Sequence, residues 1–191
     1  MAVSELAPGL WRWTARHPAW TPADGDEWDA DVGCVYAEID GGIVLVDPQV
    51  PEDTEGFWRA LDRDVERLGT PTVLTTNDDH TRSAGEIAER YGSGGRPGTG
   101  VTGFPTAYPG ETVYWLEPYG ALVPGDVLLG TDGGGVRVCP DSWLDGVPRE
   151  VVSASLQPLL DLPIERILVS HGEPVLADGG AALARALRDE R

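Results

Sequence analysis

The chain has 191 residues, of which 32 are acidic and 14 basic, so its formal charge is −18 at pH 7. A surface this negative repels phosphate backbones and anionic lipid, which argues against binding to nucleic acid or to a membrane surface. With 41% hydrophobic residues and seven Trp, the chain has enough apolar material for a packed core. We expect one domain over residues 1–191 with a small-molecule substrate as its partner, and the oligomeric state is left open.

The first half of the chain alternates predicted strands and helices. Apolar residues recur at spacings of four, four and three between Thr54 and Leu68, which is typical of a helix with one buried stripe, and Gly69 ends it. A second, shorter helix is expected over Ala84–Tyr91, before Gly92. The predicted strands are Leu10–Thr14, Cys34–Ile39, Ile43–Val46 and Thr72–Thr76, the middle two forming a hairpin across Asp40-Gly41-Gly42.

The second half repeats this alternation. Helices are expected over Val151–Leu160, where Pro158 perturbs the end, and after Asp178, a good N-cap residue. Because strands and helices are interleaved in both halves, the pattern predicts an α/β fold. The predicted strands are Thr112–Leu116, Ala121–Leu129 (interrupted at Pro124-Gly125-Asp126) and Ile167–Ser170.

Cysteine content and the absence of targeting features indicate a reducing compartment. Only Cys34 and Cys139 are present, so one disulfide at most could form. The chain shows neither a secretory signal pattern nor a bilayer-spanning segment, since its longest strongly apolar run is Ile43–Val46. We expect a cytoplasmic protein whose two thiols are small, buried core residues.

Polar residues at the ends of predicted strands are the candidates for chemistry, because strand ends present loop residues at a common edge of a sheet. Four places qualify: Asp47 after Ile43–Val46, the segment 75–80, Asp126, and His171. Two of the three His in the chain, His80 and His171, lie at these places. This distribution is the main functional signal in the sequence.

The order of these pieces resembles the metallo-β-lactamase fold superfamily over nearly the whole chain. Asp79-His80 matches the last two residues of the family's HxHxDH motif. Gly125-Asp126 matches its Gly-Asp pair, and Ser170-His171 matches its last metal-binding His. Asp47 matches a first, chiefly structural Asp. The resemblance implies an α/β fold of the four-layer αββα sandwich type.

The chain also departs from the family motif. Thr75-Thr76-Asn77 stands where His-x-His is expected, and Ala107 stands where the family has a His just ahead of a Pro-Gly pair. The resemblance therefore implies that the three imidazoles of the first metal site are missing. It also implies that a second site survives, with Asp79, His80 and His171 as metal ligands and Asp126 as a ligand that the family shares between two metals.

This remnant could hold one divalent metal. Two imidazoles and one or two carboxylates suit zinc first, and manganese or iron(II) use the same ligand types. By the resemblance, Asp79 would bind the metal and also orient the attacking water. Asn77 could hold a water or a substrate oxygen through its amide, and Arg82 could meet a substrate carboxylate.

Two functions follow from this interpretation. The first is a hydrolase with a single metal, cleaving an ester, thioester, amide or lactone by metal-bound hydroxide. The alternative is a non-catalytic protein of the same fold that binds a small ligand or a protein partner without metal, since Thr75, Asn77 and Ala107 have replaced ligands. Metal content distinguishes the two.

Overall fold

The computed structural model describes residues 3–24, 28–92 and 98–189. The chain divides into two compact units, and each consists of a β-sheet with helices packed against it. Unit 1 comprises Met1–Thr75 and Asp79–Val101, and unit 2 comprises Thr76–Asp78 and Thr102–Arg191. The expectation of one domain over residues 1–191 stays a prediction.

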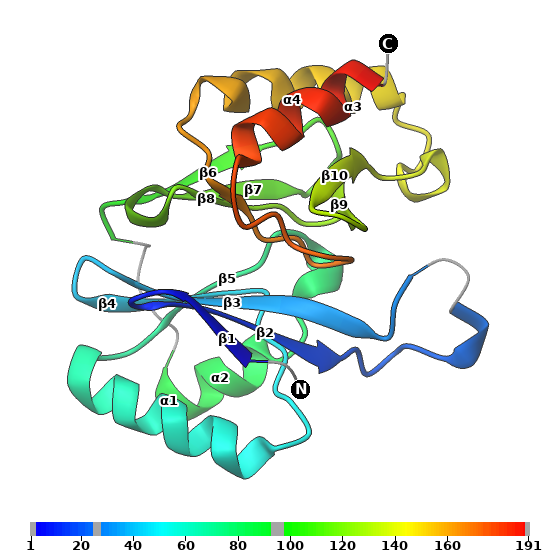
Figure 1. Ribbon diagram of the computed structural model, residues 1–191. Coiled ribbons are helices and arrows are strands. Elements are labelled where there is room, and N and C mark those ends of the chain that lie inside the picture. The colour runs from blue at the N-terminus through cyan, green and yellow to red at the C-terminus, as the bar shows by residue number, and fades with distance from the viewer. Residues whose placement is uncertain (1–2, 25–27, 93–97, 190–191) are drawn as a thin grey trace. The chain divides into compact units, whose positions relative to one another are not determined.

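Unit 1 contains a five-stranded sheet in the order β1-β2-β3-β4-β5. Only the β4–β5 pair is parallel. Helices α1 and α2 cover one face of this sheet (Figure 1). The elements are β1 (Val3–Ala7), β2 (Leu10–Arg16), β3 (Asp31–Ile39), β4 (Gly42–Val46), α1 (Thr54–Leu68), β5 (Thr72–Leu74) and α2 (Ala84–Tyr91).

Local sequence explains the boundaries of α1. The Asp53 carboxylate accepts a hydrogen bond from the Gly56 N–H at 3.0 Å, as an N-cap does. At the other end, Gly69 takes a φ of +86° and donates its N–H to the Val65 carbonyl. The apolar stripe of the helix, including buried Leu61, packs on the sheet. The predicted range is confirmed.

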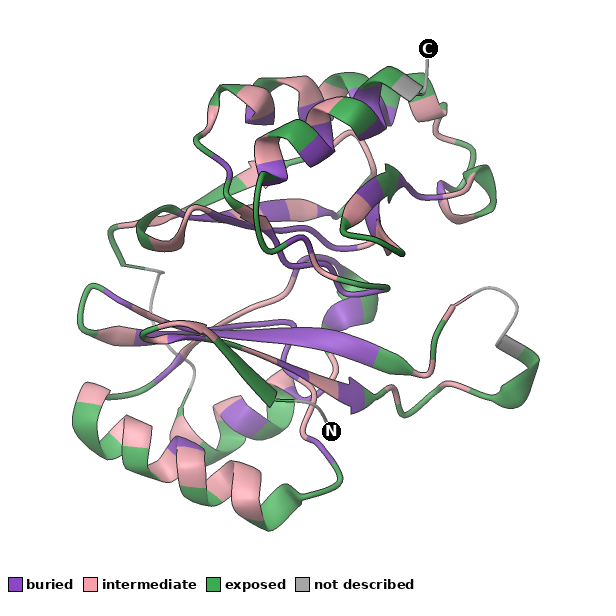
Figure 2. Ribbon diagram, viewed as in Figure 1, coloured by how far each residue is buried: buried purple, intermediate pink, exposed green. Residues whose placement is uncertain are grey.

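Unit 2 contains a four-stranded sheet in the order β11-β8-β7-β6 and a separate β9–β10 hairpin. The two helices α3 and α4 lie on one side of this unit (Figure 1). Buried residues run along its strands and along one side of each helix (Figure 2). The elements are β6 (Val101–Pro105), β7 (Thr112–Leu116), β8 (Ala121–Val123), β9 (Leu128–Thr131), β10 (Gly135–Val138), α3 (Arg149–Leu156), β11 (Arg166–Ile167) and α4 (Gly179–Asp189).

Several predicted boundaries differ from those of the structure, and the largest changes are in unit 2. The helix expected over Val151–Leu160 is α3 followed by a 3-10 helix over Gln157–Asp161. The change occurs at Gln157, directly before Pro158, whose ring nitrogen cannot donate an α-helical hydrogen bond. The strand expected over Ile167–Ser170 is confined to Arg166–Ile167. Among the residues that the structure describes, no helix is long and apolar enough to cross a membrane.

Both cysteines are buried and free, as predicted. Burial raises the pKa of the Cys34 thiol to about 11 and that of Cys139 to about 12. The reactive thiolate is therefore scarce at pH 8. We expect iodoacetamide to label either cysteine about 100-fold or more slowly in the folded protein than in denaturant, as measured by mass spectrometry. Rapid labelling of the folded protein at either position would contradict this expectation.

Candidate functional site

Parallel pairing of β8 and β11 brings Asp126 and His171 together. Arg166 pairs with Ala121 and Ile167 with Leu122, an offset of 45 residues, and the same offset relates His171 to Asp126. β8 ends at Val123 and β11 at Ile167, so the segments that follow leave the sheet side by side and carry Asp126 and His171. The His171 Nε2 lies 3.3 Å from the Asp126 Oδ1.

Asn77 contacts the same carboxylate from a third chain segment. Its side-chain Nδ2 donates to the Asp126 Oδ2 at 3.0 Å. The segment is fixed beside β7 because the Thr112 N–H donates to the Thr76 carbonyl at 2.8 Å. Asn77 is buried, so its amide holds Asp126 in one orientation. The predicted role of Asn77 toward water or substrate stays a prediction.

A buried carboxylate, Glu111, fixes the turn that carries Asp126. Its side chain accepts the backbone N–H of Asp126 at 2.9 Å and that of Val127 at 3.2 Å. A Cβ atom at Gly125 would lie 2.8 Å from the Thr76 Oγ1, so the turn also requires glycine there. Glu111 was not predicted from the sequence. The available signal was an acidic residue directly before the apolar strand Thr112–Leu116.

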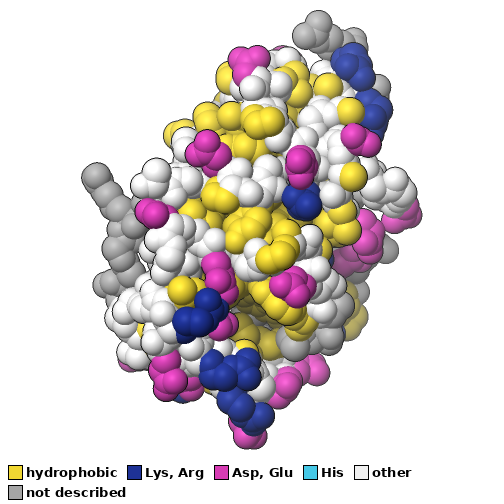
Figure 3. Space-filling view, turned by 60° about the vertical axis from the view of Figure 1, so that its left-hand side comes forward, with side chains coloured by type: hydrophobic (Ala, Val, Ile, Leu, Met, Phe, Trp, Pro, Cys, Tyr) yellow, Lys and Arg dark blue, Asp and Glu magenta, His cyan; other side chains and the backbone are white. Residues whose placement is uncertain are grey.

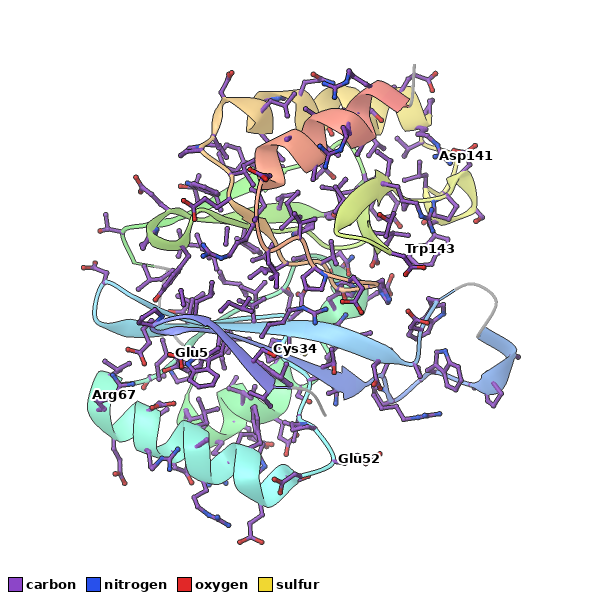
Figure 4. The ribbon with its side chains drawn as sticks, in the orientation of Figure 1. Glu5, Cys34, Glu52, Arg67, Asp141 and Trp143 are labelled. Atoms are coloured by element: carbon purple, nitrogen blue, oxygen red, sulfur yellow. The ribbon has the colours of Figure 1, made fainter. Side chains whose placement is uncertain are left out.

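Two further contacts hold His171. Its carbonyl accepts the Gly130 N–H at 2.9 Å. The Trp143 ring, labelled in Figure 4, meets the imidazole edge-on with ring centroids 5.6 Å apart. Trp143 follows β10 in a 3-10 helix over Asp141–Trp143. This contact was also missed, because no local pattern links Trp143 to His171.

In unit 1, His80 pairs with Asp47. The Asp47 N–H donates to the Leu74 carbonyl at 3.0 Å, which extends the parallel β4–β5 ladder by one residue. Its carboxylate Oδ2 lies 2.9 Å from the His80 Nδ1, and both side chains are buried. A carboxylate in this position favours the tautomer with a proton on Nδ1, which leaves the lone pair on Nε2.

Asp79 and Arg82 are the other two residues of unit 1 that the sequence predicts for the site. Asp79 is exposed in the short 3-10 helix over Asp78–His80, next to buried His80. Arg82 donates from Nη1 to the carbonyls of Gly33 and Asp47, both at 3.0 Å. Arg82 therefore tethers main-chain segments of its own unit. Its role toward a substrate, and that of Asp79 toward a metal, stay predictions.

The donor chemistry suits a metal ion. Among the residues that the structure describes, Asp126 and His171 of unit 2 offer a carboxylate and an imidazole, which are ligand types for a metal ion, and His80 of unit 1 offers a second imidazole. Asp79 is not among these donors. The family resemblance places imidazoles of the first metal site at positions 77 and 107. In the structure, the Asn77 amide donates to Asp126, and the Ala107 N–H donates to the Ser155 Oγ at 3.0 Å. The surviving donors are two imidazoles and one carboxylate.

No protein-family model and no curated protein matches the sequence. Solved structures do match. DIM-1 metallo-beta-lactamase is 13% identical with a TM-score of 0.67, over 99% of this chain and 96% of that one. A metallo-beta-lactamase from Pontibacter korlensis is 15% identical with a TM-score of 0.63, over 98% and 99%. A metallo-beta-lactamase family protein from Thermus thermophilus is 16% identical with a TM-score of 0.57, over 97% and 80%. These matches confirm the fold class expected from the sequence.

Proposed function

We propose that this chain, which has the metallo-β-lactamase fold, is a hydrolase that uses one divalent metal held by His80, Asp126 and His171. Its substrate class is an ester, thioester, amide or lactone. Zinc is the first choice of metal because it favours nitrogen and oxygen ligands in sets of three with one open position. Manganese and iron(II) accept the same ligand types.

The spacing of Asp126 and His171 carries this proposal. Their facing atoms are 3.3 Å apart, which is longer than the usual N–H···O hydrogen bond of about 2.7–3.2 Å. Two ligands each about 2.0–2.1 Å from a tetrahedral zinc are themselves about 3.3–3.4 Å apart. The pair is therefore spaced as two ligands of one zinc ion would be.

Neighbouring side chains orient the proposed metal ligands. Asn77 donates to the Asp126 Oδ2, which leaves Oδ1 toward His171. Asp47 holds His80 in the tautomer whose Nε2 lone pair is available. A bound divalent metal supplies Lewis acidity and lowers the pKa of water to about 7. Asp79 is exposed beside His80, and in this proposal its carboxylate would orient the attacking water and accept its proton.

Metal-dependent turnover tests this proposal. Protein stripped by a chelator is assayed with a chromogenic ester, a thioester, a β-lactam and a lactone, and again after reloading with zinc or manganese. We expect hydrolysis of at least one class that chelation abolishes and metal restores. Loss of a general base typically costs 10²–10⁴-fold, so Asp79→Asn should lower kcat by about 100-fold or more.

Asp78→Asn is the matched control, because Asp78 is the exposed neighbour of Asp79 in the same 3-10 helix. Its kcat should stay within about twofold of the wild type, as for an exposed residue outside the chemistry. Full activity of Asp79→Asn would rule out the role given to Asp79. Turnover that is unaffected by chelation would rule out the metal mechanism.

One observation favours the non-catalytic alternative. The Asp126 carboxylate is already held by a protein donor, because the Asn77 amide donates to its Oδ2 at 3.0 Å. Such a polar network can be a satisfied structural element without an ion. A protein that binds no zinc when zinc is added would favour this alternative.

A further inference from the structure

Unit 1 contains a cavity of about 570 Å³ between its sheet and α1. This volume lies in the range of about 300–1,000 Å³ that is usual for small-molecule sites. None of the residues of the candidate functional site lines the cavity. It is therefore a separate feature of the fold, which the proposed hydrolase does not use.

The walls of the cavity are mainly apolar and include aromatic rings. Four rings line it, those of Trp11 and Trp13 from β2, Tyr36 from β3 and Phe57 from α1. Large exposed hydrophobic side chains are few among the described residues, and two of the four, Val3 and Trp11, belong to this lining. Figure 3 shows one face of the protein on which hydrophobic side chains reach the surface among Arg, Asp and Glu side chains. Exposed apolar surface next to a cavity is typical of a binding site.

The lining of the cavity contains more acidic than basic side chains. Four carboxylates, Glu5, Glu38, Asp53 and Asp64, face two guanidinium groups, Arg63 and Arg67. Arg67 is paired within the lining, because its Nη1 donates to Glu38 at 3.1 Å and its Nη2 to Asp64 at 3.1 Å. The lining therefore has a net charge of −2, and the whole chain adds a field of the same sign.

We propose that this cavity binds a small aromatic cation, a protonated aryl-alkyl amine. The ring of the ligand packs against the aromatic walls. The ammonium group lies over ring faces by cation–π attraction and toward Glu5, which is labelled with Arg67 in Figure 4. An anion of the same shape meets the net negative charge instead and binds less tightly.

Calorimetric titration of the full chain with 2-phenylethylammonium, and separately with 3-phenylpropionate, tests this site. We expect saturable binding of the ammonium, at least about 10-fold tighter than that of the carboxylate. Glu5→Gln removes one charge from an exposed strand residue and should weaken the ammonium binding by about two- to fivefold, as expected for an exposed ion pair. Ala60→Trp places a large ring in the cavity and should abolish it.

Glu52→Gln serves as the matched control, since Glu52 is an exposed acid outside the lining (Figure 4) and its loss should leave the titration unchanged. Thermal unfolding checks that each variant is folded. If Ala60→Trp does not fold, the Glu5→Gln and Glu52→Gln pair still decides the result. Equal affinity for the two probes, unchanged binding by Glu5→Gln, or the absence of saturable binding would each overturn the proposal.

Discussion

Replacing His171 by alanine is expected to lower the metal content of the purified protein from about one ion per chain to none. The proposed site has three protein ligands, and the variant keeps only two. Loss of a residue that merely orients a ligand typically costs 10–100-fold in affinity, so loss of a ligand itself should cost about 100-fold or more. Plasma mass spectrometry on protein prepared without chelator or nickel resin measures this directly.

His17→Ala is the matched control for that experiment. His17 contacts the Trp28 ring and accepts the Ala19 N–H, and it is not in the donor set of the site. This variant should keep the metal content of the wild type. Undiminished metal in His171→Ala would contradict the proposed ligand set. A wild-type protein that takes up no zinc after incubation would instead support the non-catalytic alternative.

Helices and central strands were predictable because their local signals agree with their packing. Helix α1 has its cap residues and its buried stripe in the printed sequence, and the range 54–68 is confirmed. The hairpin turn at Asp40-Gly41 has φ values of +53° and +75°, which suit Asp and Gly in a two-residue turn. Such signals lie within a few residues of the element they define.

The strands β1, β6 and β10 were not predicted, and all three are edge strands. An edge strand has one strand neighbour instead of two, so its sequence need not be strongly apolar. The residues of β1 show this, since Val3, Ser4 and Glu5 are all exposed. Their strand conformation depends on pairing with β2, which is tertiary information.

The candidate site was predictable only in part. The resemblance to the metallo-β-lactamase fold picked out Asp126 and His171 in the sequence. They lie close together because the parallel strands β8 and β11 place the segments that follow them side by side. The contacts of Asn77 and Glu111 with the Asp126 segment join positions separated by 49 and 15 residues. No short-range pattern encodes such contacts, because they arise when separate loops pack together.

Glu111→Ala is expected to lower the free energy of unfolding by about 3 kcal/mol. The substitution leaves the buried N–H groups of Asp126 and Val127 without the carboxylate that accepts them, and each such group costs about 1–3 kcal/mol. Urea unfolding followed by Trp fluorescence measures the change. Glu117→Ala is the control, because Glu117 is exposed and should stay within about 0.5 kcal/mol of the wild type.

Glu111→Gln separates the structural role of this residue from its effect on the metal site. The amide oxygen can still accept one of the two N–H groups, so its destabilisation should be smaller than that of Glu111→Ala. Because the Asp126 turn then keeps only part of its support, zinc affinity should fall by about 10–100-fold, the usual cost of losing an orienting contact. Stability of Glu111→Ala equal to that of the wild type would show that the turn does not depend on Glu111. Weaker zinc binding in a Glu111→Gln variant that remains folded would instead link this buried carboxylate to the orientation of Asp126.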